Sequence, residues 1–335
     1  MMTRRTGWAA IALIALVLAA CQPKPKSQTV NFSILSTESA QGLQDLWAPF
    51  IADMRKETGL DVKPYFASNY TALVEAMRFN QTQLGWFSNF SGLAAVRRGG
   101  GEVFARTTDP SGVDGYFSAL IVGSRSGLTL DRVLKCDKTL SFGIGDANST
   151  SGTLAPMTYL FAPRGIRPET CFKQMRNANH QANLAAVANG MLDVATNNST
   201  SIRIDRERHT GMAEKVRVIW ESPKLPEDPI IWRKDLDPAV KEKLRRFFLT
   251  YGQGEGAEAQ RQRDLMAKLS IGGFRPGDNT HLLPVQEMEA TELYLEAKNG
   301  GDKAKIAAAE KTLNDIRAQR AALEAKAGQA PAAPQ

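Results

Sequence analysis

The sequence predicts an α/β protein of two lobes joined by two extended segments, with a helical extension at the C-terminus. Three observations lead to this fold class. Strand-like apolar runs alternate with amphipathic helical runs from residue 30 onward, and the alternation starts again near Leu128. A stretch with two prolines, residues 221–228, then separates this second unit from a last strand and helix. Such alternation favours parallel sheets with crossover helices, and 335 residues suffice for about two domains.

Residues 1–20 have the features of a secretory signal peptide. Two arginines precede an apolar run over residues 8–20, which is shorter than the roughly 20 residues that a spanning helix needs. The run ends in Leu18-Ala-Ala-Cys21, which resembles the lipobox of bacterial lipoproteins. We therefore expect a lipid at Cys21, a polar tether over 21–29, and a periplasmic or cell-envelope location. The alternative is an ordinary signal peptide followed by an incidental cysteine.

The first unit is expected to contain residues 30–118 and 229–300. Ser36 to Ser39 supply N-cap side chains before its first helix. Strands are expected in it over 30–35, 60–65, 84–87, 102–107 and 230–233, and helices over 43–58, 70–80, 92–98 and 238–250. A further strand over 117–123 is expected where the chain crosses to the second unit.

The second unit is expected to span residues 119–228. Strands are expected over 139–144, 172–176, 192–196 and 216–220, and helices over 153–161 and 180–189. The chain would cross between the lobes near Tyr116–Val122 and again near Glu221–Trp232. Two lobes joined in this way can close on a small ligand, and in open α/β sheets the site lies beyond the carboxyl ends of the strands.

Two cysteines other than Cys21 suggest a disulfide. Cys136 and Cys171 each lie just before a predicted strand. If those strands are parallel neighbours, both thiols lie near the same edge of the sheet. In an exported protein we expect them to pair; the alternative is two unrelated thiols.

Residues 301–326 are predicted to form a separate helix, followed by a disordered tail over 327–335. Mostly apolar residues recur in it every seven positions. We expect a packing helix or a homodimer contact; the alternatives are a solvated helix and a scaffold that acts through this helix alone. The recurring positions are Ile306, Leu313 and Arg320, and Ala309, Ile316 and Leu323.

The positive charge does not indicate a nucleic-acid partner. A net charge of +7 would be compatible with one. However, two arginines lie in the signal peptide, and the segment from Lys298 onward has seven basic and four acidic residues. The remaining body is close to balanced, so we expect no nucleic-acid binding.

The segment Gly143–Gly152 is the strongest candidate for a binding site. It follows a predicted strand and opens a helix, whose free N–H groups favour an anion. Three consecutive hydroxyls, Ser149, Thr150 and Ser151, add donors. No lysine follows as in a P-loop. The alternative is a plain N-cap turn.

Other candidates could complete such a site. His180 follows the next predicted strand, and Tyr70, Tyr116 and Trp232 flank strands or crossings, where a tyrosine hydroxyl can reach a cleft. The three histidines are far apart in the sequence, so no metal or other cofactor is expected. A hydrolase triad of Ser149, His180 and an aspartate can be drawn, but Ser149 lacks the nucleophile-elbow context. We therefore expect a binding protein rather than an enzyme.

Several segments in order resemble the phosphonate-binding proteins of ABC importers, the PhnD type, over roughly residues 30–295. They are Phe32–Ser39, Tyr70 with Met77–Asn80, Gly143–Gly152, Asn177–His180, Asp193–Asn198 and Val218–Trp232. The resemblance implies a two-lobed periplasmic-binding-protein fold of type II. It also implies a phosphonate as ligand and an ABC permease with its ATPase as partners.

The resemblance also implies roles for individual residues. Ser149, Thr150 and Ser151 would cradle the phosphonate oxygens, with Tyr70 and His180 completing the shell. Tyr116 and Asp228 would face the organic end of the ligand, where Asp228 could pair with an amine. Ser36, Thr37 and Asn89 would line the first lobe's side.

One position departs from the family pattern. Members that bind aminoalkylphosphonates carry a glutamate shortly after the pair that is Asn197-Asn198 here, whereas this chain continues Ser199-Thr200-Ser201. An alkylphosphonate, phosphite or phosphate therefore remains an alternative ligand. Glu221 and Glu227 are candidates to replace the missing acid.

Overall fold

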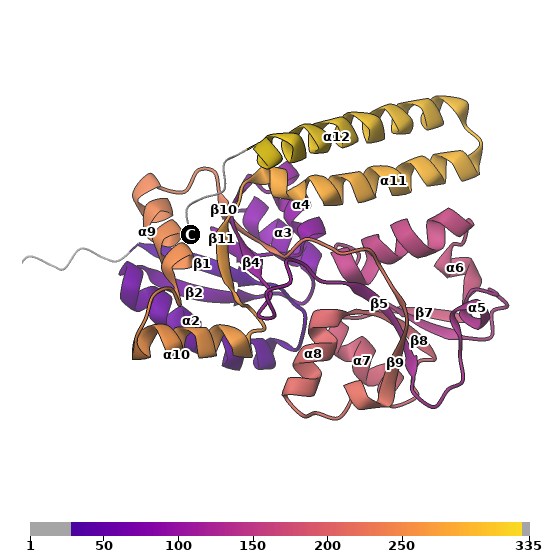
Figure 1. Ribbon diagram of the computed structural model, residues 1–335, viewed down its shortest axis with the longest axis horizontal. Coiled ribbons are helices and arrows are strands. Elements are labelled where there is room, and N and C mark those ends of the chain that lie inside the picture. Colours follow the sequence, from indigo (N-terminus) through magenta and orange to yellow (C-terminus); the bar gives the residue numbers. More distant parts are fainter. Residues whose placement is uncertain (1–27, 330–335) are drawn as a thin grey trace, which may run out of the picture.

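The computed structural model describes residues 28–329. Within that range the strands form two sheets, and helices cover both faces of each (Figure 1). We call the six-stranded sheet with its helices the first lobe and the five-stranded sheet with its helices the second lobe. The predicted signal peptide, the lipidation at Cys21 and the last six residues lie outside the described residues.

The first lobe has the strand order β11-β4-β10-β3-β1-β2. Helices α2 and α3 begin at the side-chain caps Ser39 and Asn69. The sequence pattern did not reveal α10 and β11. The elements are β1 (Thr29–Ile34), α2 (Ala40–Thr58), β2 (Asp61–Phe66), α3 (Tyr70–Arg78), β3 (Leu84–Trp86), α4 (Asn89–Arg98), β4 (Gly101–Thr108), β10 (Pro229–Arg233), α9 (Pro238–Thr250), α10 (Ala257–Lys268) and β11 (Gly273–Pro276).

The second lobe has the strand order β7-β6-β8-β5-β9. The helix predicted at 153–161 begins earlier, at Thr150, because the Ser149 side chain caps it, and two of its stretches have the wider π-helical turn. The elements are β5 (Ser118–Gly123), α5 (Leu130–Val133), β6 (Ser141–Ile144), η2 (Thr150–Leu154), η3 (Met157–Phe161), α6 (Pro168–Cys171), β7 (Gln174–Asn177), α7 (His180–Ala188), β8 (Val194–Asn198), α8 (Ser199–Glu207) and β9 (Val216–Glu221).

Both sheets are mixed, so the expectation of mainly parallel sheets was too simple. Strand β10 pairs antiparallel with β3 and β4, and β5 pairs antiparallel with β8 and β9. These are the strands that follow a crossing from the other lobe. Each enters its sheet from the side where the lobes meet, and it therefore runs opposite to neighbours that point toward that side.

Two connecting segments join the lobes, residues 109–117 and 222–228. They pair with each other where Tyr116 and Leu225 exchange both backbone hydrogen bonds, at 3.0 and 2.7 Å. The two crossings therefore form one short two-stranded connection rather than two independent linkers.

Each lobe has its own apolar core. In the first lobe, Trp47, Phe50 and Phe248 are buried on the face covered by α2 and α9. In the second lobe, Phe142 and Phe172 stack at 4.4 Å between ring centroids. Beside this core the structure joins Cys136 and Cys171 in a disulfide, at the edge where β6 and β7 run parallel.

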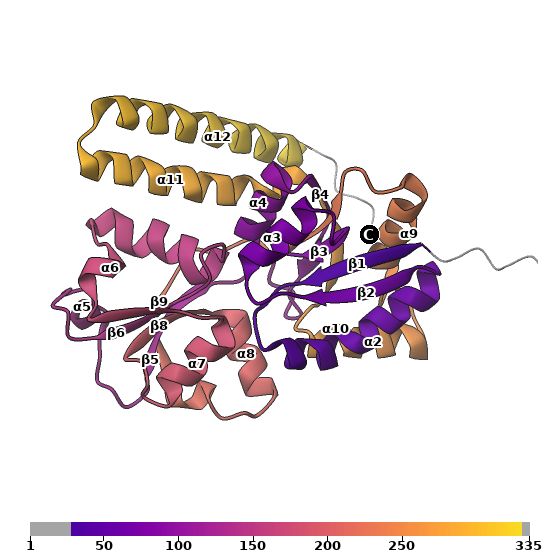
Figure 2. The same ribbon diagram turned by 180° about the vertical axis from the view of Figure 1, so that it is seen from behind.

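The C-terminal segment is a hairpin of α11 (Leu283–Gly300) and α12 (Lys303–Gln329). Both views place it along one side of the molecule, above the two lobes (Figures 1 and 2). Two of the predicted seam residues, Leu313 and Ile316, are buried against Leu283 and Ala290 of α11. The heptad pattern thus serves packing within the chain. No helix among residues 28–329 is long and apolar enough to span a bilayer.

Candidate functional site

Helix N-termini from both lobes meet at the carboxyl ends of the strands. Helices α3 and α4 follow β2 and β3, while η2, α7 and α8 follow β6, β7 and β8. Each of these five begins at a Ser or Asn whose side chain accepts a first-turn N–H. The free N–H groups and dipoles of converging helix starts favour a negatively charged ligand.

A cavity of about 60 Å³ lies between these helix starts. A water needs about 10–15 Å³ on the same measure, so the cavity has room for roughly four to six water-sized groups. Its polar lining residues come from both lobes, and no lysine or arginine is among its described lining residues. The polar and aromatic lining residues are Thr37, Tyr70, Trp86, Ser88, Thr107, Tyr116, Ser149, Ser151, His180, Asn198, Thr200, Ser201, Glu227, Asp228 and Ser270.

One end of the cavity is built from neutral hydrogen-bond donors. Ser149 Oγ accepts the N–H of Gly152 at 2.9 Å, which leaves its hydroxyl proton free to donate. Ser151 Oγ accepts from Asn198 Nδ2 at 3.2 Å and lies 3.5 Å from His180 Nε2. These contacts hold the two hydroxyls in place, and each hydroxyl can donate a hydrogen bond to a bound oxyanion.

Two tyrosine hydroxyls add to this end. Burial, followed by the nearby Asp228 charge, raises the pKa of both Tyr70 and Tyr116 well above 10. Both therefore stay protonated and can donate. Contacts with Ser149 and Ser151, respectively, offset part of each rise in pKa, and all four side chains line the same cavity.

His180 is neutral in this site. Burial lowers its pKa to about 4, so at neutral pH the ring carries one proton and no charge. Its Nδ1 is buried without a hydrogen-bond partner among the described residues. An unpartnered buried nitrogen is costly and favours a ligand that completes it.

The other end of the cavity is acidic. Asp228 precedes β10, and its Oδ1 lies 3.4 Å from Asn89 Nδ2. Burial, followed by the neighbouring Glu227 charge, raises the pKa of Asp228 well above its usual value; contacts with Trp86 and Tyr116 offset part of this rise. Burial, reinforced by Asp109 and Asp114, raises the pKa of Glu227 to about 7 although Thr107 donates to it.

The remaining sequence candidates lie beside the cavity rather than in its lining, apart from Thr37. Ser36 donates to the carbonyl of Ala67 at 2.8 Å. Asn89 donates to the carbonyl of Pro226, also at 2.8 Å. Thr150 uses its hydroxyl oxygen to accept the N–H of Phe90 from the first lobe at 2.9 Å. Trp232 is buried in the first lobe's core, stacked on Phe104.

The hydrolase hypothesis required a contact between His180 and Ser149, and the structure does not show it. The His180 ring nitrogen approaches Ser151 rather than Ser149, and no acid orients its Nδ1 within the described residues. A triad requires both contacts. No cluster of metal-ligating side chains was found among residues 28–329 either.

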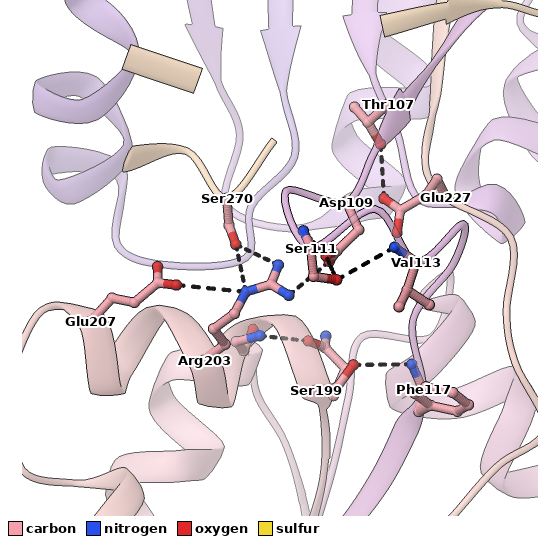
Figure 3. Close-up of polar contacts among 12 residues, drawn as sticks. Thr107, Asp109, Ser111, Val113, Phe117, Ser199, Arg203, Glu207, Glu227 and Ser270 are labelled. Carbon is pink, nitrogen blue, oxygen red and sulfur yellow. Dashed lines mark hydrogen bonds and ion pairs between the residues drawn. The ribbon is translucent and has the colours of Figure 1, made fainter. Parts of the chain in front are cut away.

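The lobes are closed on each other and held by ionic contacts (Figure 3). Arg203 of α8 reaches across the cleft to Asp109 at 2.7 Å and to Ser270 Oγ at 2.6 Å. A second arginine of α8, Arg208, pairs with Glu38 at 2.6 Å. Sequence reasoning missed these residues because they are distant in the chain and carry no motif.

Two lobes joined by paired crossings and closed on a donor-lined cavity define a periplasmic solute-binding protein. The family described as "ABC transporter, phosphonate, periplasmic substrate-binding protein" matches residues 32–282. The chain belongs to this family. It is therefore a substrate-binding component of a phosphonate ABC transporter, located in the periplasm.

Relatives support this assignment. The chain is 37% identical to the phosphonates-binding periplasmic protein of Escherichia coli over 82% of this chain and 80% of that protein. It is also 37% identical to a solved binding protein of a Pseudomonas aeruginosa ABC phosphonate transporter, with a TM-score of 0.85 over 89% of this chain and 100% of that one. A Prochlorococcus marinus protein solved with methylphosphonate shares the fold at 19% identity and a TM-score of 0.68, over 78% and 97% of the two chains. These relatives are binding proteins and not enzymes, in agreement with the sequence prediction.

Proposed function

We propose that the protein captures a phosphonate between its lobes and delivers it to the permease of an ABC importer. The observation that carries the proposal is the cluster of neutral donors at one end of the cavity. Ser149 and Ser151 would bind phosphonate oxygens, with the hydroxyls of Tyr70 and Tyr116 and the ring of His180 completing the shell. Thr150 would act indirectly, by fixing the start of η2 against the first lobe.

The alternative ligand is phosphite or phosphate. The cavity is small, and two relatives at about a quarter identity bear the names phosphite-binding protein and phosphate-import protein. Phosphonates are favoured because the cavity continues beyond the donors to Asp228 and Glu227, which a bare oxyanion would leave uncontacted.

Calorimetric titration of the mature protein tests this proposal. We expect sub-micromolar binding of at least one phosphonate and weaker binding of phosphite and phosphate. Ser151→Ala should weaken all of them, because it removes a donor to the shared oxyanion. Absence of heat with every phosphonate, phosphite and phosphate would refute the function.

Asp228 provides a second test. If it pairs with an amine, Asp228→Asn should weaken aminoalkylphosphonates by about 1.5–3 kcal/mol, the scale of a charged hydrogen bond. Alkylphosphonates should be almost unaffected. Equal losses on both would contradict the pairing.

The assembly is proposed from the sequence. A lipid at Cys21 would hold the protein at the membrane near its permease, and labelling with a fatty-acid analogue, lost on Cys21→Ser, tests it. A homodimer through α12 would need surface that α11 leaves free, such as around the exposed Leu323. Light scattering of the mature protein would measure its oligomeric state.

A further inference from the structure

Asn198 lies between the oxyanion donors of the cavity and the first turn of α8. It lines the cavity and is buried, with 6% of the residue exposed. Its amide oxygen Oδ1 accepts the N–H of Ser201 at 2.7 Å and thereby caps α8. Its amide nitrogen Nδ2 lies 3.2 Å from Ser151 Oγ. One side chain thus joins a serine of the oxyanion end to the start of a helix.

The backbone determines which end of the amide faces Ser151. A backbone N–H can only donate, so the atom of Asn198 that meets the N–H of Ser201 is the amide oxygen. The atom that faces Ser151 is therefore the amide nitrogen, which also can only donate. Ser151 Oγ must accept this bond, so a lone pair and not the hydroxyl proton is directed at Asn198.

The other neighbours of Ser151 compete weakly for that proton. His180 Nε2 lies 3.5 Å from Ser151 Oγ, at the outer limit of a hydrogen bond. Tyr116, which also contacts Ser151, keeps its own proton and can itself donate. An anionic oxygen accepts a shorter and stronger bond than a neutral nitrogen at that distance. The Ser151 hydroxyl is therefore available to donate to a bound oxyanion.

The residues on either side of Asn198 hold its backbone in place. Asn197 is fully buried, and its Oδ1 accepts the N–H of Asn198 while its Nδ2 donates to the carbonyl of His180, both at 2.9 Å. Ser199 donates its N–H to the carbonyl of Phe117 at 2.9 Å, and its Oγ accepts the N–H of Phe117 at 3.1 Å (Figure 3). Because the backbone is held on both sides, the amide has little freedom to turn away from the cavity.

Building on the proposed function, we propose that Asn198 is a positioning residue that fixes the hydroxyl of Ser151 as a donor to the bound oxyanion. The cap of α8 does not require an asparagine, because a serine caps a helix about equally well. A serine at this position would have no amide nitrogen, and its shorter side chain would end before the place from which Asn198 donates to Ser151. The amide is thus explained by the binding site and not by the helix.

A double-mutant cycle on the mature protein tests this role. Titration calorimetry would measure 2-aminoethylphosphonate, ethylphosphonate and phosphite on the wild type, on Asn198→Ser, on Ser151→Ala and on the double variant. Asn198→Ser should weaken every probe that the wild type binds about tenfold, because the shared oxyanion loses an oriented donor. When Ser151 is already alanine, the same change should alter the affinity less than threefold, since residues that act through one another are not additive.

Asn179→Ser is the matched control. Asn179 caps α7 by accepting the N–H of Ala182 at 2.9 Å, and it does not line the cavity. A serine preserves this cap as it preserves the cap of α8. The control should therefore change each affinity less than twofold.

The outcomes separate this proposal from the function on which it rests. Affinities of Asn198→Ser within twofold of the wild type would overturn it and leave phosphonate binding intact. Additive losses in the double variant would also overturn it, because Asn198 would then not act through Ser151. If the wild type binds none of the three probes, the proposed function fails and this role fails with it.

A second variant covers the case in which Asn198→Ser does not fold. Asn198→Asp keeps the size of the side chain and its cap, and it can complete the same cycle. The added negative charge repels the ligand with or without Ser151, so this repulsion cancels in the comparison. The loss should be at least threefold larger with Ser151 present than with alanine in its place, and equal losses would contradict the proposal.

Discussion

The ionic contact between Arg203 and Asp109 should control how readily the lobes close. Arg203 belongs to the second lobe, whereas Ser270 belongs to the first lobe and Asp109 begins the connecting segment directly after β4 of the first lobe (Figure 3). Replacing Arg203 with alanine removes its ion pair to Asp109, its hydrogen bonds to Ser270 Oγ, and a longer, exposed pair to Glu207 within α8. It also leaves the side chain of Asp109, only 5% exposed, with the Ser111 contacts alone.

The size of the effect follows from this burial. A hydrogen bond to a charged group contributes about 1.5–3 kcal/mol, and an exposed ion pair about 0–1 kcal/mol. Arg203 is 31% exposed, so an intermediate value of about 2 kcal/mol is reasonable. If the contact forms only when the lobes close, the variant should bind its ligand about 30-fold more weakly.

Calorimetry with the tightest-binding phosphonate measures this loss, and small-angle scattering without ligand should show a larger radius of gyration. Arg132→Ala is the matched control, because Arg132 pairs with Asp137 inside the second lobe. It should change neither quantity. If Arg203→Ala binds the ligand within twofold of the wild type and its scattering is unchanged, the contact between Arg203 and Asp109 does not control lobe closure.

Three further predictions concern the site and its support. Gly145→Ala should weaken ligand binding and lower stability by about 1–3 kcal/mol, because a Cβ there would lie 2.5 Å from Gly152 Cα; Gly300→Ala, which meets open space, is the control, and equal melting temperatures would contradict the prediction. Replacing Cys136 and Cys171 with serine should lower the free energy of unfolding by about 2–4 kcal/mol, since the disulfide spans 35 residues of sequence; denaturant titration checks this, and an unchanged midpoint would argue against it. The pKa of Glu227, raised to about 7, means that the folded protein holds a proton that the unfolded chain has lost between about pH 4.5 and 7. Stability should therefore fall as pH rises through this window, by up to about 3 kcal/mol; Asp109, Asp114 and Arg203 face the same group. The melting temperature of Glu227→Gln relative to the wild type should be higher at pH 8 than at pH 5, and a pH-independent difference would be evidence against a buried neutral Glu227.

The sequence predicted most of the fold because its signals are local. Hydrophobic periodicity and capping residues such as Ser39 and Asn69 are visible within a few positions. The direction of β5 and β10 could not be predicted from local signals, because it depends on where each crossing enters its sheet. Helix α10 escaped notice because few of its residues are buried.

For the candidate site too, local features could be predicted from the sequence, whereas features that depend on distant residues could not. The hydroxyls after β6 stand next to one another in the sequence, and their placement at a helix start follows from a single strand-turn-helix unit. Which of them faces the cavity does not follow, because Thr150 is turned toward Phe90 by the packing of the first lobe. Glu227 could be named only as one of two candidates, since its orientation depends on Thr107, which is 120 residues away.

The apolar cluster that spans both lobes has a thermodynamic consequence. Leu154 and Ala155 of the second lobe pack in one cluster with Leu35 of the first lobe and with Val285 and Met288 of α11. Opening the lobes would expose this surface to water, and closing them would bury it again. Burial of apolar surface lowers the heat capacity. If the lobes close on the ligand, binding should therefore show a negative heat-capacity change that is larger than burial of a small polar ligand alone would cause. Temperature would then tune the affinity through side chains that the ligand never touches.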